Sequence, residues 1–133
     1  MLSAVTHYDK ISLQPNSGAN GEFAGLTAMM RFHASRGDTK RKLCLIPTSA
    51  HGTNPATAVI CGLDVVPINC DEKGNIDLED FKAKIQLHST EIAACMITYP
   101  STFGVFESSV RELCDLVHSV GGKVYMDGAN LNA

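Results

Sequence analysis

The six residues IAACMI, at positions 92–97, decide the fold class of this chain. They form a nearly continuous apolar run between Glu91 and Thr98. A strand with one wet face alternates apolar and polar residues, whereas a continuous run is typical of a strand covered on both faces, as in a parallel sheet. The run is also too short to be a helix of ordinary length. Ile92–Ile97 is therefore predicted to be a buried strand of a parallel sheet.

Three further apolar runs of the same kind lie on either side of this one, and we predict that they are strands as well. They are Leu43–Ile46, Val65–Ile68 and Val124–Met126. Stretches with helical spacing of their apolar residues separate the four runs. The alternation of helix and strand predicts an α/β fold, with a mostly parallel sheet, right-handed crossovers and helices on both faces.

The helical stretches carry recognisable start and stop signals. Asp77 is placed to cap a helix over Leu78–Leu87, and Asn54 followed by Pro55 resembles a cap with proline at the first helical position. The helix that opens at Asn54 is predicted to run to about Cys61. Two more helices are predicted from apolar spacing: Ala19–Arg36, through Phe23, Leu26, Met30 and Ala34, and a helix through Val110, Leu113, Cys114, Val117 and Val120 that stops at Gly121–Gly122.

Composition and charge exclude several classes of function. The chain has 133 residues and a net charge of −3, and its only basic cluster is Lys40–Lys42, which argues against a nucleic-acid partner. No apolar run approaches the roughly 20 residues that span a bilayer, and the first residues do not resemble a signal peptide. The 5 cysteines are scattered without a CxxC pair, so we expect reduced thiols and no metal site.

Polar residues collect where three of the predicted strands end. The segments are TSAHGTN at 48–54, TYPSTFG at 98–104 and DGANLN at 127–132. Ligands of open α/β sheets bind beyond the carboxyl ends of the strands, so this edge is the expected site. The charged residues expected at the opposite edge are predicted to lie in solvent-exposed turns; they are Lys40, Arg41, Lys42, Glu91 and Lys123.

Three features at the expected site have a chemical interpretation and an ordinary one. Ser17, Gly18 and Ala19 open a helix, where free N–H groups favour an anion, although such loops are often simple turns. His51 is suited to stack on a planar ligand or to transfer protons, or it is a surface loop histidine. Asp127 follows an apolar strand, where a carboxylate needs a partner such as a protonated ring nitrogen, or it caps the next turn.

Hydroxyl groups follow the strand Ile92–Ile97. Thr98, Ser101 and Thr102 are able to donate hydrogen bonds to the same ligand, and a β-turn around Tyr99–Pro100 does not exclude that role. The remaining histidines are expected to be structural or solvated; they are His7, His33, His88 and His118.

Five longer segments of the sequence resemble one protein family. An anion-binding helix start, a histidine after the next strand and an aspartate after a later strand occur along the chain in the order expected of fold type I pyridoxal-phosphate enzymes. The amino-acid sequences of five segments resemble those of the P-protein family of the glycine cleavage system. The resemblance covers Tyr8 to Ala133. The segments are LQPNSGANGEFAGL, CLIPTSAHGTNPATA, GNIDLEDFKAK, MITYPSTFGVFE and VYMDGANLNA.

The resemblance implies a pyridoxal 5′-phosphate site. Ser17, Gly18 and Ala19 resemble the residues that hold the phosphate. His51 resembles the imidazole that stacks on the pyridine ring, and Asp127 resembles the aspartate that holds the pyridinium nitrogen, so these two are the expected catalytic residues. Thr98 lies where a residue near the ring hydroxyl is usual.

The resemblance also implies a reaction and partners. Glycine is decarboxylated, and the aminomethyl group passes to the lipoyl arm of the H-protein, in a homodimer or paired-subunit assembly. The Schiff-base lysine of the family lies beyond Ala133, and no lysine of this chain is well placed. We therefore expect residues 1–133 to be an incomplete part of the large cofactor domain, inactive alone. The family is mitochondrial in eukaryotes and cytoplasmic in bacteria, and we favour the mitochondrial matrix.

Three alternatives remain open at this point. Another fold type I lyase or decarboxylase would share the roles of His51 and Asp127. A truncated, non-catalytic paralogue would explain the missing lysine. A nucleotide-binding doubly wound domain would need a glycine-rich loop after its first strand, and PTSAHGTN suits a nucleotide poorly.

Overall fold

A computed structural model describes residues 1–131. Its centre is a four-stranded sheet in the order β2-β1-β3-β4, and every neighbouring pair is parallel. The prediction of a parallel α/β fold is confirmed, with each of the four predicted runs lying inside a strand. The strands are β1 (Leu43–Pro47), β2 (Asp64–Ile68), β3 (Ile92–Thr98) and β4 (Lys123–Asp127).

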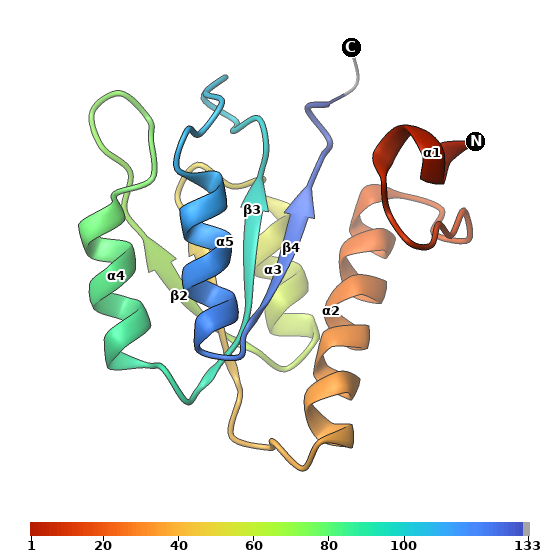
Figure 1. Cartoon of the computed structure of the whole chain (residues 1–133), viewed down its shortest axis with the longest axis horizontal. Coiled ribbons are helices and arrows are strands. Elements are labelled where there is room, and N and C mark those ends of the chain that lie inside the picture. The colour runs from red at the N-terminus through yellow and green to blue at the C-terminus, as the bar shows by residue number, and fades with distance from the viewer. Residues whose placement is uncertain (132–133) are drawn as a thin grey trace.

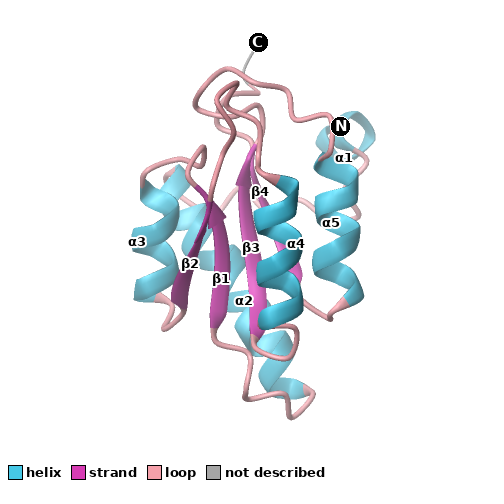
Figure 2. Cartoon of the chain, turned by 90° about the vertical axis from the view of Figure 1, so that its left-hand side faces the viewer, coloured by secondary structure: helices cyan, strands magenta, loops and turns pink. Residues whose placement is uncertain are grey.

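Helices cover both faces of the sheet (Figures 1 and 2). On one face lie α2 (Gly18–Ser35) and α3 (Thr53–Ile60), and on the other lie α4 (Leu78–Leu87) and α5 (Val110–Ser119). Each face has its own hydrophobic cluster. The sheet therefore needs apolar residues on both sides, as the continuous runs in the sequence indicated.

Strand β3 shows most directly how the sequence produces this architecture. All of its residues are buried. Ile92, Cys95 and Ile97 pack into the cluster with α4 and α5. Ala93, Ala94 and Met96 pack into the cluster with α2 and α3. The small alanines lie on the face that carries the longest helix.

Two of the predicted helix signals are confirmed and one is wrong. The Asp77 carboxylate accepts hydrogen bonds from the backbone N–H groups of Glu79 and Asp80, and α5 is followed by Gly121 at φ 86°. Asn54, by contrast, is not the cap of α3, because the helix begins at Thr53 with Gly52 before it. The side chain of Asn54 is instead fully buried at the edge of the sheet.

The buried stripe of α2 differs from the predicted one. Leu26 is buried as expected, but Phe23 and Ala34 are exposed. The buried residues at this helical spacing are Glu22, Leu26 and His33. The helix is turned relative to the prediction because two polar side chains find buried partners: His33 pairs through Nε2 with the Ala93 carbonyl, and Glu22 pairs at the sheet edge.

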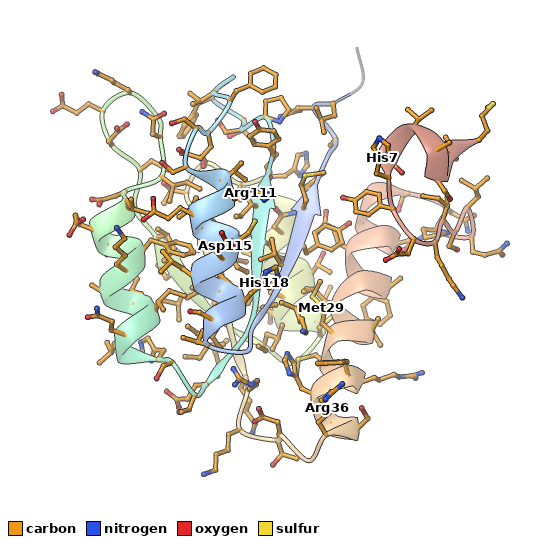
Figure 3. All side chains as sticks on the ribbon, in the orientation of Figure 1. His7, Met29, Arg36, Arg111, Asp115 and His118 are labelled. Carbon is orange, nitrogen blue, oxygen red and sulfur yellow. The ribbon has the colours of Figure 1, made fainter. Side chains whose placement is uncertain are left out.

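The remaining features are peripheral. A short helix that the sequence patterns did not indicate, α1 (Leu2–Thr6), precedes α2 and buries none of its residues. All five cysteines are free, and burial raises the pKa of the Cys44 thiol to about 12. Beside the edge strand β4, a groove is lined by Met29 and His118, which Figure 3 labels. No helix within residues 1–131 has the length and apolar character to cross a membrane.

Candidate functional site

The carboxyl ends of β3 and β4 and the start of α2 lie at one end of the molecule (Figure 1). Strand β1 runs parallel to β3 and ends on the same side (Figure 2). We call this end the site edge, defined by Glu22, Asn54, Thr98 and Asp127 with the nearby His51. Parallel pairing places Thr98 beside Asp127 in register, and the loop after β1 reaches the same place through His51. The predicted convergence of three strand ends is confirmed.

Asp127 ends β4 and is held firmly. Its side chain belongs to a residue that is only 8% exposed. One carboxylate oxygen accepts a hydrogen bond from the Asn54 amide at 3.1 Å, and the other accepts one from the backbone N–H of Ala129 at 3.0 Å. Each oxygen keeps a free lone pair, so the carboxylate is oriented and still able to accept from a ligand.

Asn54 and Thr98 connect Asp127 to the His51 loop. The Thr98 hydroxyl donates to Asn54 Oδ1 at 3.3 Å and accepts from the backbone N–H of His51 at 2.6 Å. Both side chains are buried, so these bonds are protected from competition with water. Thr98 was predicted to lie near a cofactor hydroxyl; its own hydroxyl already serves to position the His51 loop and Asn54.

Glu22 is a site residue that the sequence patterns did not single out. It is 3% exposed, and its two oxygens accept hydrogen bonds from the hydroxyls of Thr53 at 2.6 Å and Thr57 at 2.8 Å. A signal was available, since Glu22 precedes Leu26 by one helical step on the buried stripe of α2. A carboxylate on the apolar face of a helix needs partners from another element.

Glu22, His51 and Asp127 bring one ligand-type atom each within 4.8 Å of one another. The expectation of no metal site rested on spacing along the sequence, which does not reveal such a convergence of distant residues. All four carboxylate oxygens already accept a hydrogen bond from the protein. The arrangement is a compact cluster of two buried carboxylates beside an exposed imidazole, and it is suited to a cationic group.

Tyr125 borders the acidic pair. Burial raises the pKa of its phenol, and the charges of Asp127 and Glu22 raise it further. Helix α2 approaches this ring closely at Gly25, where a Cβ atom would lie 2.7 Å from the Tyr125 ring. Glycine at position 25 therefore allows the helix that carries Glu22 to pack directly on β4.

Ser17, Gly18 and Ala19 lie at the start of α2 and are exposed. The Ser17 hydroxyl caps the helix by accepting from the backbone N–H of Asn20 at 3.2 Å. In the first turn of a helix, N–H groups have no intrahelical acceptor, so those of Gly18 and Ala19 remain available for an anion. The Glu22 contacts with α3 hold this end of α2 near the site edge.

The hydroxyls of Ser101 and Thr102 are used within the loop after β3. Ser101 Oγ accepts from the backbone N–H groups of Phe103 and Val105, and Thr102 Oγ1 donates to the Ser49 carbonyl. The hydrogen-bonded turn lies later than the predicted turn around Tyr99–Pro100, because the backbone N–H of Gly104 donates to the Ser101 carbonyl.

Comparisons with known proteins find relatives that match this chain along its whole length. Glycine dehydrogenase (decarboxylating) of Photobacterium profundum is 61% identical over 133 residues, which is 100% of this chain and 14% of the relative. The second such enzyme of Colwellia psychrerythraea is 59% identical over 133 residues, again 100% of this chain and 14% of the relative. This segment belongs to the glycine dehydrogenase (decarboxylating) family. No protein-family model matches the chain.

Solved structures show the same fold as this glycine dehydrogenase segment. Mouse CSAD matches with a TM-score of 0.74 and 19% identity, over 96% of this chain and 30% of that one. An inhibitor-bound glycine decarboxylase (P-protein) of the glycine cleavage system matches with a TM-score of 0.71 and 15% identity, over 95% and 26%. A pyridoxal-phosphate-bound C-S lyase from Staphylococcus hominis matches with a TM-score of 0.63 and 17% identity, over 78% and 27%. The fold type I assignment is confirmed.

The chain spans about 14% of the length of these glycine dehydrogenases. Both organisms are bacteria, and so is Rhodopseudomonas palustris, whose enzyme is 60% identical over 132 residues, 99% of this chain and 13% of the relative. The preference for the mitochondrial matrix is therefore not supported.

Proposed function

We propose that residues 1–133 supply part of the pyridoxal-phosphate site of a glycine-cleaving P-protein. The whole protein would decarboxylate glycine and pass the aminomethyl group to the lipoyl arm of the H-protein, in an assembly of paired subunits in the cytoplasm. The observation that carries the proposal is the buried, oriented carboxylate of Asp127 beside His51, in a chain 59–61% identical to enzymes of that name.

The residues at the site edge fit the cofactor chemically. Asp127 offers a carboxylate for a protonated ring nitrogen, and its N–H partners leave one lone pair free on each oxygen. His51 is exposed, so its ring face is open to a planar ligand. The N–H groups of Gly18 and Ala19, with the Ser17 cap beside them, suit a phosphate.

Each residue then has a defined part in the reaction. Bound pyridoxal phosphate supplies a ring that stabilises the negative charge left when carbon dioxide departs. Asp127 keeps a proton on the ring nitrogen, because a buried carboxylate favours a cationic partner. His51 holds the plane of the ring and excludes water from one face. Asn54 holds the Asp127 side chain, and Thr98 holds Asn54 and the backbone of His51.

No lysine that would hold the cofactor covalently is identified among residues 1–131. Within residues 1–131, no lysine hydrogen-bonds to Glu22, His51 or Asp127; Lys84, for example, donates to Asp80 and to the Pro67 carbonyl. We propose that the lysine comes from another part of the protein and that residues 1–133 form part of the cofactor domain.

The test is a chimera in which residues 1–133 replace the matching segment of the Photobacterium profundum enzyme. We expect it to bind pyridoxal phosphate, to absorb in the visible region and to exchange bicarbonate carbon into glycine when the H-protein is present. The chain alone should bind the cofactor weakly. A folded chimera that binds the cofactor without glycine exchange would favour another lyase or decarboxylase, and one that binds no cofactor would favour a non-catalytic paralogue.

A further inference from the structure

Glu22 is a buried carboxylate without a cationic partner. It is 3% exposed, and among residues 1–131 it forms no ion pair. Burying a charge in this way is costly unless hydrogen bonds compensate it. Its two bonds come from hydroxyls of α3, Thr53 and Thr57. Because burying this charge costs free energy, we look for a role of Glu22 other than packing.

The short contact with Thr53 fixes where the hydroxyl proton lies. Thr53 Oγ1 and Glu22 Oε1 are 2.6 Å apart, which is the length of a charge-assisted O–H···O⁻ bond. A carboxylate only accepts, so Thr53 donates its single proton to Glu22. Thr53 Oγ1 also lies 3.0 Å from His51 Nδ1. Having no second proton, Thr53 must accept from His51, and Nδ1 must carry the hydrogen.

A competing contact is weaker. The backbone N–H of Thr53 lies 3.4 Å from His51 Nδ1 and would need that nitrogen as an acceptor. This distance exceeds the usual range of 2.7–3.2 Å for a hydrogen bond from a backbone N–H, so the 3.0 Å contact decides the tautomer. Nε2 then keeps the lone pair of the neutral ring.

We infer that Glu22 is a positioning residue that acts through Thr53 to hold His51 as its Nδ1–H tautomer, with Nε2 as the basic nitrogen at the site edge. The tautomer follows from this chain's own contacts. Its value for catalysis rests on the proposed function, in which a His51 ring of fixed orientation and known basic nitrogen faces the cofactor. The partner of a histidine's second nitrogen commonly sets the state of the first.

The tautomer is measurable without any cofactor. In the 133-residue chain labelled with ¹⁵N-histidine, long-range ¹H–¹⁵N spectra at a pH where the ring is neutral distinguish Nδ1–H from Nε2–H, and a His51→Gln variant assigns the signal. We expect Nδ1–H as the main form. Thr53→Val should shift the population towards Nε2–H, and Thr53→Ser should restore Nδ1–H. Glu22→Gln should also shift it, because an amide N–H can donate to Thr53 and reverse the hydroxyl.

Thr57→Val is the matched control. Thr57 lies on the same helix, and its hydroxyl faces two acceptors, the Glu22 carboxylate at 2.8 Å and the Thr53 backbone carbonyl at 3.0 Å. The structure shows no hydrogen bond between Thr57 and His51 or the Thr53 hydroxyl. This variant should leave the tautomer unchanged and reports any general disturbance of Glu22. A main Nε2–H form in the unmodified chain, or an equal response to Thr57→Val and Thr53→Val, would overturn the inference.

A second measurement covers variants whose chain folds poorly alone. In the chimera, Thr53→Val should raise the cofactor dissociation constant about 2- to 10-fold, as expected for one lost hydrogen bond, with rescue by Thr53→Ser and no change for Thr57→Val. If Thr53→Ser did not restore the affinity, that result would count against the hydrogen-bond chain from Glu22 through Thr53 to His51, which we call the relay. If the chimera binds no cofactor while the chain shows Nδ1–H, the proposed function fails and the relay stands.

Discussion

The two ends of the sheet satisfy their polar groups in different ways. At the site edge, Glu22, Asn54, Thr98 and Asp127 are buried and are held by neutral hydroxyl and amide donors. At the opposite edge, where the strands begin, charges pair with opposite charges: Arg41 with Asp38 and, when His88 is protonated, His88 with Glu91. At that edge the pairs are part-exposed.

The difference supports the proposal that the site edge binds a ligand. Carboxylates that are oriented by neutral donors keep their negative charge uncompensated, so they attract a cationic group that the protein does not supply. Charges that are paired near water have little left to offer a ligand. Substitutions at the site edge should therefore change ligand binding or buried hydrogen bonding, and those at the opposite edge should change little.

The largest effect is expected for Asp127→Asn in the chimera. Losing one partner of a buried charge pair costs about 2–5 kcal/mol, so cofactor affinity should fall by about 30-fold or more. Equilibrium binding of pyridoxal phosphate, followed by absorbance, measures this loss. Glu91→Gln, an exposed carboxylate of the opposite edge, is the control and should change the affinity less than about twofold. If Asp127→Asn and Glu91→Gln lowered the cofactor affinity equally, the proposed difference between the two edges of the sheet would be wrong.

The next effect is expected for Asn54→Ala. Asn54 is 0% exposed, and its removal leaves the Asp127 oxygen and the Thr98 hydroxyl without one partner each. A buried polar group without its partner costs about 1–3 kcal/mol, and urea unfolding of the chain should show a loss of this size. Asn69→Ala removes an exposed amide and should stay within about 0.5 kcal/mol. A loss within that limit for Asn54→Ala would mean that the network is not needed for stability.

A smaller effect concerns the acidity of Tyr125. Burial and the charges of Asp127 and Glu22 raise the pKa of its phenol above the ordinary 10.0. Glu22→Gln removes one of these charges, so the pKa should fall while remaining raised. Alkaline titration of phenolate absorbance measures it, with Tyr125→Phe identifying the signal among the 3 tyrosines. An unchanged pKa in Glu22→Gln would mean that the carboxylate is neutral or distant.

The raised pKa of Tyr125 also gives stability a pH dependence of known sign. A group whose pKa is higher in the folded state contributes its full stabilisation below its unfolded pKa near 10.0 and loses it as the pH rises through the folded value. We therefore expect stability to fall above about pH 10. Tyr125→Phe should reduce this alkaline loss.

The sequence predicted the fold well because a parallel sheet leaves a direct trace. Continuous apolar runs such as Ile92–Ile97 report burial on two faces, and the residues that follow them mark the ligand edge. His51 and Asp127 were found in this way. Their roles towards the cofactor came from resemblance and stay a proposal.

The parts that the sequence did not reveal depend on contacts between distant helices. Asn54 is a residue type that often caps helices, and only its hydrogen bond to Asp127, 73 residues further along the chain, shows that it orients that carboxylate. The apolar spacing does not single out Glu22, because it places Phe23 on the buried stripe of α2, where the structure has Glu22 buried and Phe23 exposed. Arg41 was expected in a solvated turn, yet it donates to the buried Ile92 carbonyl at 2.6 Å.

The smallest effect is expected for Asp38→Asn at the opposite edge. The substitution removes the carboxylate that Arg41 Nε contacts at 2.5 Å, in a pair whose carboxylate side chain is 36% exposed. Arg41 keeps its place, because it still donates to the Ile92 carbonyl. The Arg41 side chain is only 12% exposed, but the Asp38 carboxylate is near water. A pair of this kind contributes about 0–1 kcal/mol and is screened by salt, so urea unfolding should show a small loss that shrinks further at high salt. Cofactor binding by the chimera should not change. A larger loss, or one that reached the cofactor, would show that the two edges are coupled through β3, and the division between a ligand edge and a structural edge would not hold.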